Sequence, residues 1–257
     1  MPGPLLSVRE LSIRFRDVAQ PTVSGISFDL FPKKTLALVG GSGSGKTLIA
    51  TNLVRLSDNV EISGKILFKG RNVLNFSPKD LEQLRRCDLA YIFQEPALAL
   101  NPSLTIGYQL REIVQEKGAE KKMQTILEHV GFQDISRILR AYPHELSGGM
   151  QQRAMIALAL VNKPKILIAD EPTTALDVVL QKQILDLIRR LQQDLGFALL
   201  LITHDFALLP SLADEVCVIN AGKIIEQGTP QEILKHPQQA YTRSLVESIF
   251  TLPRVVS

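Results

Sequence analysis

Two glycine-containing motifs constrain the fold of this 257-residue chain more than any other feature. The first, Gly40 to Thr47, reads Gly-Gly-Ser-Gly-Ser-Gly-Lys-Thr, and the second, Leu146 to Arg153, reads Leu-Ser-Gly-Gly-Met-Gln-Gln-Arg. Glycine-rich loops of the first kind surround nucleotide phosphates, and a glycine-bearing helix start of the second kind can also hold an anion. Since one loop already wraps the phosphates of one nucleotide, the second motif favours ATP held between two subunits.

The first motif lies in the context that its chemistry requires. Thr35 to Val39 is an apolar run that predicts a buried strand, and a helical pattern begins at Thr47. Backbone N–H groups and the helix N-terminus favour phosphate oxygens, the lysine adds a positive charge, and the threonine hydroxyl binds Mg²⁺. The predicted phosphate-binding residues are Gly40, Gly41, Ser42, Gly43, Ser44, Gly45, Lys46 and Thr47.

Two adjacent carboxylates follow a second apolar run. The strand predicted at Ile166 to Ala169 leads directly into Asp170 and Glu171. Neighbouring side chains at a strand end point in different directions, so one carboxylate can face a metal while the other faces an attacking water. We expect Asp170 to bind Mg²⁺ and Glu171 to act as the general base; two solvated loop acids are the alternative.

Two further strand ends carry polar side chains. The run Ala198 to Thr203 delivers His204, and the run Leu89 to Phe93 delivers Gln94. Open α/β sheets bind ligands at the carboxyl ends of their strands. We therefore expect His204 to contact the γ-phosphate or to orient the water and Glu171, and Gln94 to reach Mg²⁺ and the same water. Most lone histidines are surface or core residues, which is the alternative for His204.

The second motif predicts a capped helix with an exposed anion site. Ser147 is a favourable N-cap residue, and Gly148 and Gly149 let backbone donors approach a phosphate closely. In a head-to-tail pair, these three residues of one subunit would cap the γ-phosphate held by Lys46 of the other. An ordinary capped helix without a ligand is the alternative.

The ordered set of motifs resembles the ATP-binding subunit of an ATP-binding cassette (ABC) transporter along nearly the whole chain. The resemblance implies a P-loop NTPase, RecA-like α/β core, an N-terminal antiparallel β subdomain and an inserted α-helical subdomain. It implies a single domain over 1–257, with core 1–94 and 154–257 and helical subdomain 95–153. It also assigns ATP contacts to Asp177 and, by stacking on adenine, to Phe15, for which a core position is the alternative.

Finer features resemble the branch that imports peptides or nickel. They are the segment Phe93 to Pro102, the segment Tyr142 to Met150, and His236-Pro237 followed by Tyr241-Thr242-Arg243. The resemblance implies that the chain binds transmembrane permease subunits and pairs with a second ATP-binding subunit, identical or paralogous. It also implies an indirect partnership with a substrate-binding protein. The expected location is peripheral, on the cytoplasmic face of the plasma membrane. Another importer, a lipoprotein exporter and a soluble ABC ATPase outside transport stay open as alternatives.

Composition limits the partners further. A net charge of +3 is too small to argue for nucleic acid, and no apolar stretch is long enough to cross a bilayer. A transport role therefore requires a separate membrane partner. We expect the segment Ala97 to Ser103, with exposed Leu98 and Leu100, to form the docking surface for that partner. The alternative is that both leucines pack inside the helical lobe.

Overall fold

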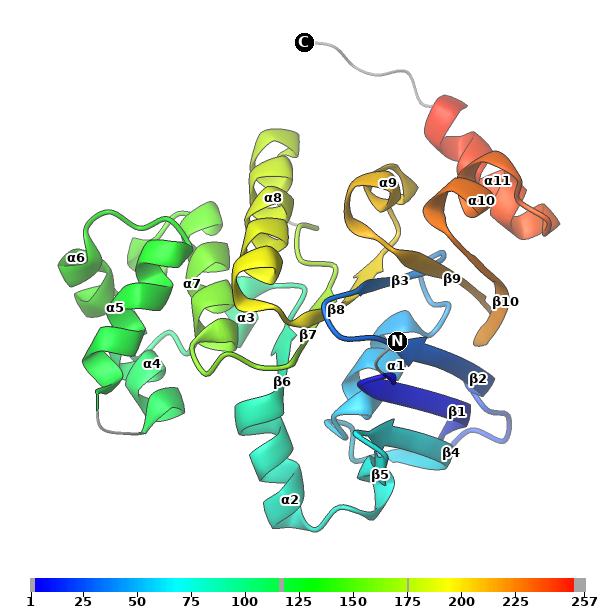
Figure 1. Ribbon diagram of the computed structural model, residues 1–257, viewed down its shortest axis with the longest axis horizontal. Coiled ribbons are helices and arrows are strands. Elements are labelled where there is room, and N and C mark those ends of the chain that lie inside the picture. Colours follow the sequence, from blue (N-terminus) through cyan, green and yellow to red (C-terminus); the bar gives the residue numbers. More distant parts are fainter. Residues whose placement is uncertain (1–2, 116–117, 175, 252–257) are drawn as a thin grey trace. The chain divides into compact units, whose positions relative to one another are not determined.

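The computed structural model describes residues 3–115, 118–174 and 176–251, apart from the side chains of residues 98 and 249–251. Contacts within the chain group it into two compact units (Figure 1). The first unit combines the residues up to Leu81 with those from Ala198 onward, and the second unit is Glu82–Phe197. The subdomain limits expected at 94/95 and 153/154 are a different division and stay a prediction.

The first unit begins with an antiparallel sheet in the strand order β2-β1-β4-β5 (Figure 1). Residues alternate between buried and more exposed along much of these strands, as expected where one face covers a core. The sequence pattern predicts a turn at Gln20-Pro21, and these residues lie in the connection between β1 and β2. The strands are β1 (Leu6–Phe15), β2 (Val23–Leu30), β4 (Val60–Phe68) and β5 (Arg71–Asn72).

The same unit contains a group of strands built around β3 (Thr35–Val39). This strand runs parallel to β8 (Ala198–Thr203) on one side and to β9 (Glu215–Asn220) on the other, and β10 (Lys223–Gly228) pairs antiparallel with β9. Every residue of β3 and β8 is buried. Strands covered on both faces need apolar side chains at every position, which explains their uninterrupted hydrophobic sequences.

Short helices complete the first unit. Helix α1 follows the phosphate-loop motif, and α9 to α11 lie in the C-terminal part of the chain (Figure 1). Helix α2 begins in this unit and ends two residues past its sequence boundary at Leu81. Val39, Val218 and Val246 belong to the hydrophobic core that α10 and α11 help to cover. The helices are α1 (Lys46–Leu53), η1 (Val73–Asn75), α2 (Pro78–Gln83), η4 (Phe206–Leu208), α9 (Leu209–Leu212), α10 (Pro230–Lys235) and α11 (Ala240–Thr251).

The second unit is mainly helical, with two parallel strands, β6 (Leu89–Ile92) and β7 (Ile166–Asp170). Its helices are η2 (Leu84–Asp88), α3 (Pro96–Ala99), α4 (Ile106–Val114), α5 (Ala119–His129), α6 (Ile135–Arg140), η3 (Pro143–Glu145), α7 (Gly148–Leu160) and α8 (Val178–Leu195). The sequence pattern predicts helices at Tyr108 to Glu116 and Lys121 to Val130, and α4 and α5 lie within two residues of these bounds. In the part of the chain that the structure describes, no helix is both long enough and apolar enough to span a bilayer.

Candidate nucleotide site

The phosphate-loop motif forms the turn between β3 and α1 in the first unit. The buried Lys46 ammonium donates hydrogen bonds to the carbonyl oxygens of Gly40 at 3.0 Å and Gly41 at 2.8 Å. Gly45 caps α1 without a side chain, and Thr47 is exposed in the first turn. A phosphate oxygen is a stronger partner for an ammonium than a peptide carbonyl, because both groups are charged. The loop therefore fits the phosphates of a nucleotide.

Gly40 is required at the start of this loop by its close approach to β9. A Cβ atom built on Gly40 would lie 2.2 Å from the carbonyl oxygen of Ile219. That partner is a backbone atom, so no side-chain rotation can relieve the overlap. The glycine thus allows the loop to leave β3 directly against the neighbouring strand.

His204 lies at the same edge of the first unit as the phosphate loop. In the parallel register of β3 and β8, Val39 is paired with Thr203. Gly40 and His204 are the next residues along these two strands, and the His204 side chain is exposed. The structure thus brings the predicted histidine to the strand end that carries the phosphate loop, while its contact with a phosphate stays a prediction.

Phe15 occupies the last position of β1, opposite Val60 of β4. Its side chain is half-buried, so it is neither a fully enclosed core residue nor a freely exposed ring. Both interpretations of this residue, stacking on adenine and packing in the core, therefore stay open. Phe15 belongs to the same unit as the phosphate loop.

The predicted carboxylates lie at the end of β7 in the second unit. Asp170 is buried, and its Oδ2 accepts a hydrogen bond of 2.8 Å from the hydroxyl of Tyr91 on β6. Burial and then the nearby carboxylate raise the pKa of Tyr91 far above its usual value. The tyrosine therefore stays protonated and serves as a hydrogen-bond donor, which stabilises the ionised form of Asp170.

Glu171 is oriented by its backbone and by two side-chain donors. Its φ angle is 44°, in the left-handed region that few residues other than glycine adopt and that is often found at functional sites. Its Oε2 accepts hydrogen bonds from Gln94 Nε2 at 3.2 Å and Thr174 Oγ1 at 2.8 Å. A carboxylate held in this way can receive a proton from a water molecule.

The second motif forms the start of α7, where Ser147 is the N-cap residue. Its Oγ accepts a hydrogen bond of 3.4 Å from the backbone N–H of Met150, and both Ser147 and Gly148 are exposed. Gly149 is buried, and a Cβ atom there would lie 3.4 Å from the Leu180 side chain of α8. The capped helix expected here is present, with its N-terminus open to solvent.

A hydrogen bond connects this helix with the carboxylate segment. Gln152 Nε2 of α7 donates to the carbonyl oxygen of Pro172 at 2.6 Å, one residue after Glu171. Further along, the Asp177 carboxylate caps α8 by accepting hydrogen bonds from the N–H groups of Val179 and Leu180. The second unit therefore holds Gln94, the two carboxylates and the second motif, and one hydrogen bond joins α7 to the segment that follows the carboxylates.

Sequence reasoning missed Tyr91, which the structure places against Asp170. In the sequence, Tyr91 differs from its neighbours because it carries the one hydroxyl group in the otherwise apolar strand Leu89–Ile92, one position before the strand ends. Among the residues that the structure describes, no three His, Cys, Asp or Glu side chains gather as metal ligands. A Mg²⁺ ion bound to a nucleotide needs only one or two protein ligands beside phosphates and water. The expected ligands Thr47, Gln94 and Asp170 therefore stay a prediction.

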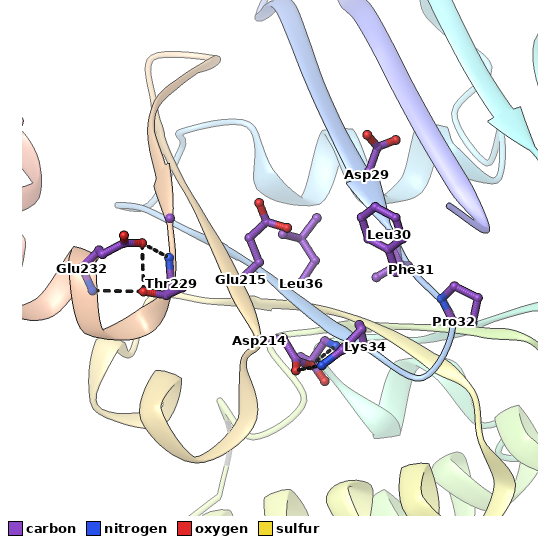
Figure 2. A pocket seen from close by; sticks show the side chains of 12 residues that line it. Asp29, Leu30, Phe31, Pro32, Lys34, Leu36, Asp214, Glu215, Thr229 and Glu232 are labelled. Carbon is purple, nitrogen blue, oxygen red and sulfur yellow. Dashed lines mark hydrogen bonds and ion pairs between the residues drawn. The ribbon is translucent and has the colours of Figure 1, made fainter. Parts of the chain in front are cut away.

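A cavity of about 660 Å³ in the first unit lies elsewhere (Figure 2). It is lined at the amino end of β3, by Thr35 and Leu36, whereas the phosphate loop follows the carboxyl end of that strand. Two charged groups on its wall pair with each other, because Lys34 Nζ lies 2.7 Å from Asp214 Oδ1, and the Glu232 carboxylate accepts a hydrogen bond from the Thr229 N–H. The cavity is therefore separate from the nucleotide chemistry.

The expected docking surface after Gln94 needs a correction at Leu100. This side chain is only 2% exposed, so it packs inside the second unit and cannot present an apolar patch to a partner. The side chain of Leu98, the other half of that expectation, lies outside the described residues. The prediction went wrong because a short apolar sequence does not distinguish a buried turn from an exposed one.

Comparisons with known proteins identify the family. The family described as ABC transporter matches residues 23–174. The chain is 47% identical over 254 residues to the peptidoglycan transport ATP-binding protein YejF of Agrobacterium fabrum, covering 95% of this chain and 46% of the relative. It is 41% identical to the dipeptide transport ATP-binding protein DppD of Bacillus subtilis, covering 95% of this chain and 76% of the relative. The chain thus spans less than half of the first relative.

Solved structures confirm the predicted fold class. The structure of cbiO1 from Clostridium perfringens, described as part of the ABC transporter complex cbiONQ, has a TM-score of 0.81 at 27% identity and covers 99% of this chain and 98% of its own. A dimeric ATP-binding cassette in a post-hydrolysis state, bound to ADP and Pi, has a TM-score of 0.76 at 22% identity, covering 88% of this chain and 98% of its own, and supports the fold alone. With the motif geometry and these matches together, the chain belongs to the ABC transporter family.

Proposed function

We propose that this chain is the ATP-hydrolysing subunit of an importer that moves peptides through a separate membrane permease. The observation that carries the catalytic part is the hydrogen-bonded pair of Gln94 and Glu171 beside the buried Asp170. The names of similar proteins, which refer to dipeptide, oligopeptide and peptidoglycan transport, support the substrate class. Nickel, also expected from the sequence, is a secondary candidate.

In this proposal the first unit binds the nucleotide. Backbone N–H groups of the loop Gly40–Thr47 and the Lys46 ammonium hold the phosphates, with the Gly41 N–H engaged by Tyr241 instead. Phe15 contacts adenine. Thr47, Asp170 and Gln94 would hold Mg²⁺, which neutralises charge on the phosphates during transfer. Lys46 already lies against the loop carbonyls, so binding requires only a change of partner for its ammonium.

Glu171 then acts as the general base. Its carboxylate accepts a proton from the water that attacks the γ-phosphate in line, while Gln94 and Thr174 hold the carboxylate in place. His204 donates a hydrogen bond to the phosphate or orients the same water. The left-handed backbone at Glu171 supports this role, because such a conformation is retained where the side chain direction matters.

A second ATP-binding subunit, identical or paralogous, completes each site. Ser147, Gly148 and Gly149 of one subunit cap the γ-phosphate bound by the other, and Asp177 lies near the same interface. The exposure of Val178 and Val179, at 80% and 67%, supports this arrangement, since apolar side chains next to Asp177 gain from burial against a partner. The open N-terminus of α7 provides the anion site.

The remaining partners follow from the transport role. Transmembrane permease subunits bind the chain at the cytoplasmic face of the plasma membrane, and a substrate-binding protein delivers the peptide to the permease. Another importer, a lipoprotein exporter or a soluble ABC ATPase would use the same hydrolytic site. Recovery of permease subunits with the wild-type chain distinguishes these transport roles from the soluble one.

Glu171→Gln tests the catalytic assignment. General-base catalysis contributes roughly 10²–10⁴-fold, so ATP turnover should fall by about 10²-fold or more while ATP binding is retained. Glu112→Gln on α4, an exposed glutamate in the same unit, is the matched control and should hydrolyse ATP at the wild-type rate. Peptide uptake by vesicles that contain the co-purified permease should stop with Glu171→Gln alone. Turnover above half of the wild-type rate would contradict the proposal.

A further inference from the structure

A tyrosine far away in the sequence contacts the phosphate loop. The backbone N–H of Gly41 donates a hydrogen bond of 3.0 Å to the hydroxyl oxygen of Tyr241, although the two residues are 200 positions apart. Tyr241 is the second residue of α11, and both residues belong to the first unit. The C-terminal helix therefore touches the loop that the proposed function assigns to ATP.

The start of α11 is fixed by its own contacts. The Glu226 carboxylate of β10 accepts hydrogen bonds from the backbone N–H groups of Gln238 at 2.7 Å and Gln239 at 3.1 Å. The Tyr241 ring is half-buried against the core that contains Val39, and the next residue, Thr242, is fully buried. Since the ring packs against this core and Glu226 holds the backbone just before it, the hydroxyl has a defined position.

The lack of a side chain at Gly41 leaves room for the Tyr241 hydroxyl. A Cβ atom built on Gly41 would lie 2.9 Å from the Tyr241 oxygen, closer than real Cβ contacts come. Any side chain at position 41 would therefore push the phenol away. The glycine and the tyrosine form one fitted pair across the beginning of the loop.

Both polar groups of Gly41 are thus engaged by other parts of the first unit. Its N–H is held by Tyr241, and its carbonyl oxygen accepts hydrogen bonds from Lys46 Nζ at 2.8 Å and from the Ser44 N–H at 3.3 Å. When Lys46 turns to a phosphate, the carbonyl loses its charged partner. The hydrogen bond from the Gly41 N–H to the Tyr241 hydroxyl oxygen does not depend on Lys46 and can keep the Gly41 peptide in place.

We infer that Tyr241 is a positioning residue that holds the phosphate loop ready for nucleotide. This inference rests on the proposed binding of ATP at Gly40–Thr47. Tyr241 acts through the Gly41 peptide and does not itself contact the phosphates. A loop fixed before binding loses less conformational entropy when the nucleotide arrives, so its affinity is higher.

Tyr241→Phe is the direct test, because phenylalanine keeps the ring and removes only the hydroxyl. Amide exchange at Gly41 should become faster in the nucleotide-free protein. The Kd for a non-hydrolysable ATP analogue should rise by about 2- to 12-fold, the factor that corresponds to one neutral hydrogen bond. The KM for ATP should rise with kcat nearly unchanged.

Two further variants separate positioning from a structural effect. Tyr108→Phe on α4, whose side chain is 50% exposed, is the matched control and should leave the Kd unchanged. In a protein that already carries Gly41→Ala, the additional Tyr241→Phe change should raise the Kd little further, because the alanine side chain already displaces the phenol. A lower Tm of Tyr241→Phe with unchanged Kd and unchanged Gly41 exchange would overturn the inference. Failure of the wild type to bind the analogue would instead overturn the proposed function. Amide exchange at Gly41 would then be the test of the Tyr241 hydrogen bond, which predicts faster exchange in Tyr241→Phe.

Discussion

The hydrogen bond between Tyr91 and Asp170 allows a quantitative prediction for Tyr91→Phe. The substitution keeps the aromatic ring, whose centroid lies 4.6 Å from that of Phe93, and removes only the hydroxyl. The lost hydrogen bond is 2.8 Å long and has a buried carboxylate as its acceptor. Because Asp170 cannot replace this donor freely with water, the loss should appear in the stability of the protein.

The magnitude follows from the charge on the acceptor. A hydrogen bond to a charged group contributes about 1.5–3 kcal/mol to the free energy of unfolding. For a chain of this size each kcal/mol changes Tm by about 2–4 °C, so Tm should fall by about 3–12 °C. Because the substitution adds no atoms, overpacking does not contribute to the expected loss in the free energy of unfolding.

Thermal melting followed by circular dichroism, without nucleotide and near pH 7, measures this effect. Tyr108→Phe, in which the lost hydroxyl is on a half-exposed side chain, is the control and should melt within about 2 °C of the wild type, as surface substitutions do. Equal Tm values for Tyr91→Phe and the wild type would refute the view that this hydrogen bond holds Asp170.

The pH dependence provides an independent check of the same contact. Burial and then the Asp170 carboxylate raise the pKa of Tyr91 above the ordinary value of 10.0, so the folded state keeps a proton that the unfolded chain releases. This contribution is fully present below pH 10 and is lost as the pH rises beyond it. Tyr91→Phe should therefore lose less stability than the wild type between pH 10 and 11.

Three other substitutions test separate features. Gly148→Asp, added to Glu171→Gln, should prevent the ATP-dependent dimer in gel filtration, because a carboxylate would face the partner's γ-phosphate; an unchanged dimer would contradict the shared site. Gly40→Ala should destabilise the protein by about 1–3 kcal/mol or more in urea unfolding, because its Cβ would lie 2.2 Å from the Ile219 carbonyl oxygen; an unchanged midpoint would refute the close approach. Burial raises the pKa of Glu226, but hydrogen-bond donors at the start of α11 together lower it below its ordinary value of 4.5. The wild type should therefore lose stability as the pH falls below 4.5, and Glu226→Gln should lose less. Parallel stability-versus-pH profiles of the two proteins would argue against this contact.

Local sequence patterns determined the elements that carry the site. The continuous apolar runs of β3, β7 and β8 predicted buried strands, and all three are buried at every position. Ser147 was expected to be an N-cap residue and is one. Such features depend on residues within a few positions of each other, so periodicity and capping preferences are sufficient to predict them.

Tertiary structure alone decided which of these residues meet and which are covered. The contacts of Tyr241 with Gly41 and of Tyr91 with Asp170 join positions 200 and 79 apart in the sequence. Leu100, expected on the surface, is buried for the same reason: the neighbours that cover it are placed by packing and not by its own segment. Local propensity says nothing about such contacts, because their free energy comes from burying the surfaces of distant elements against one another.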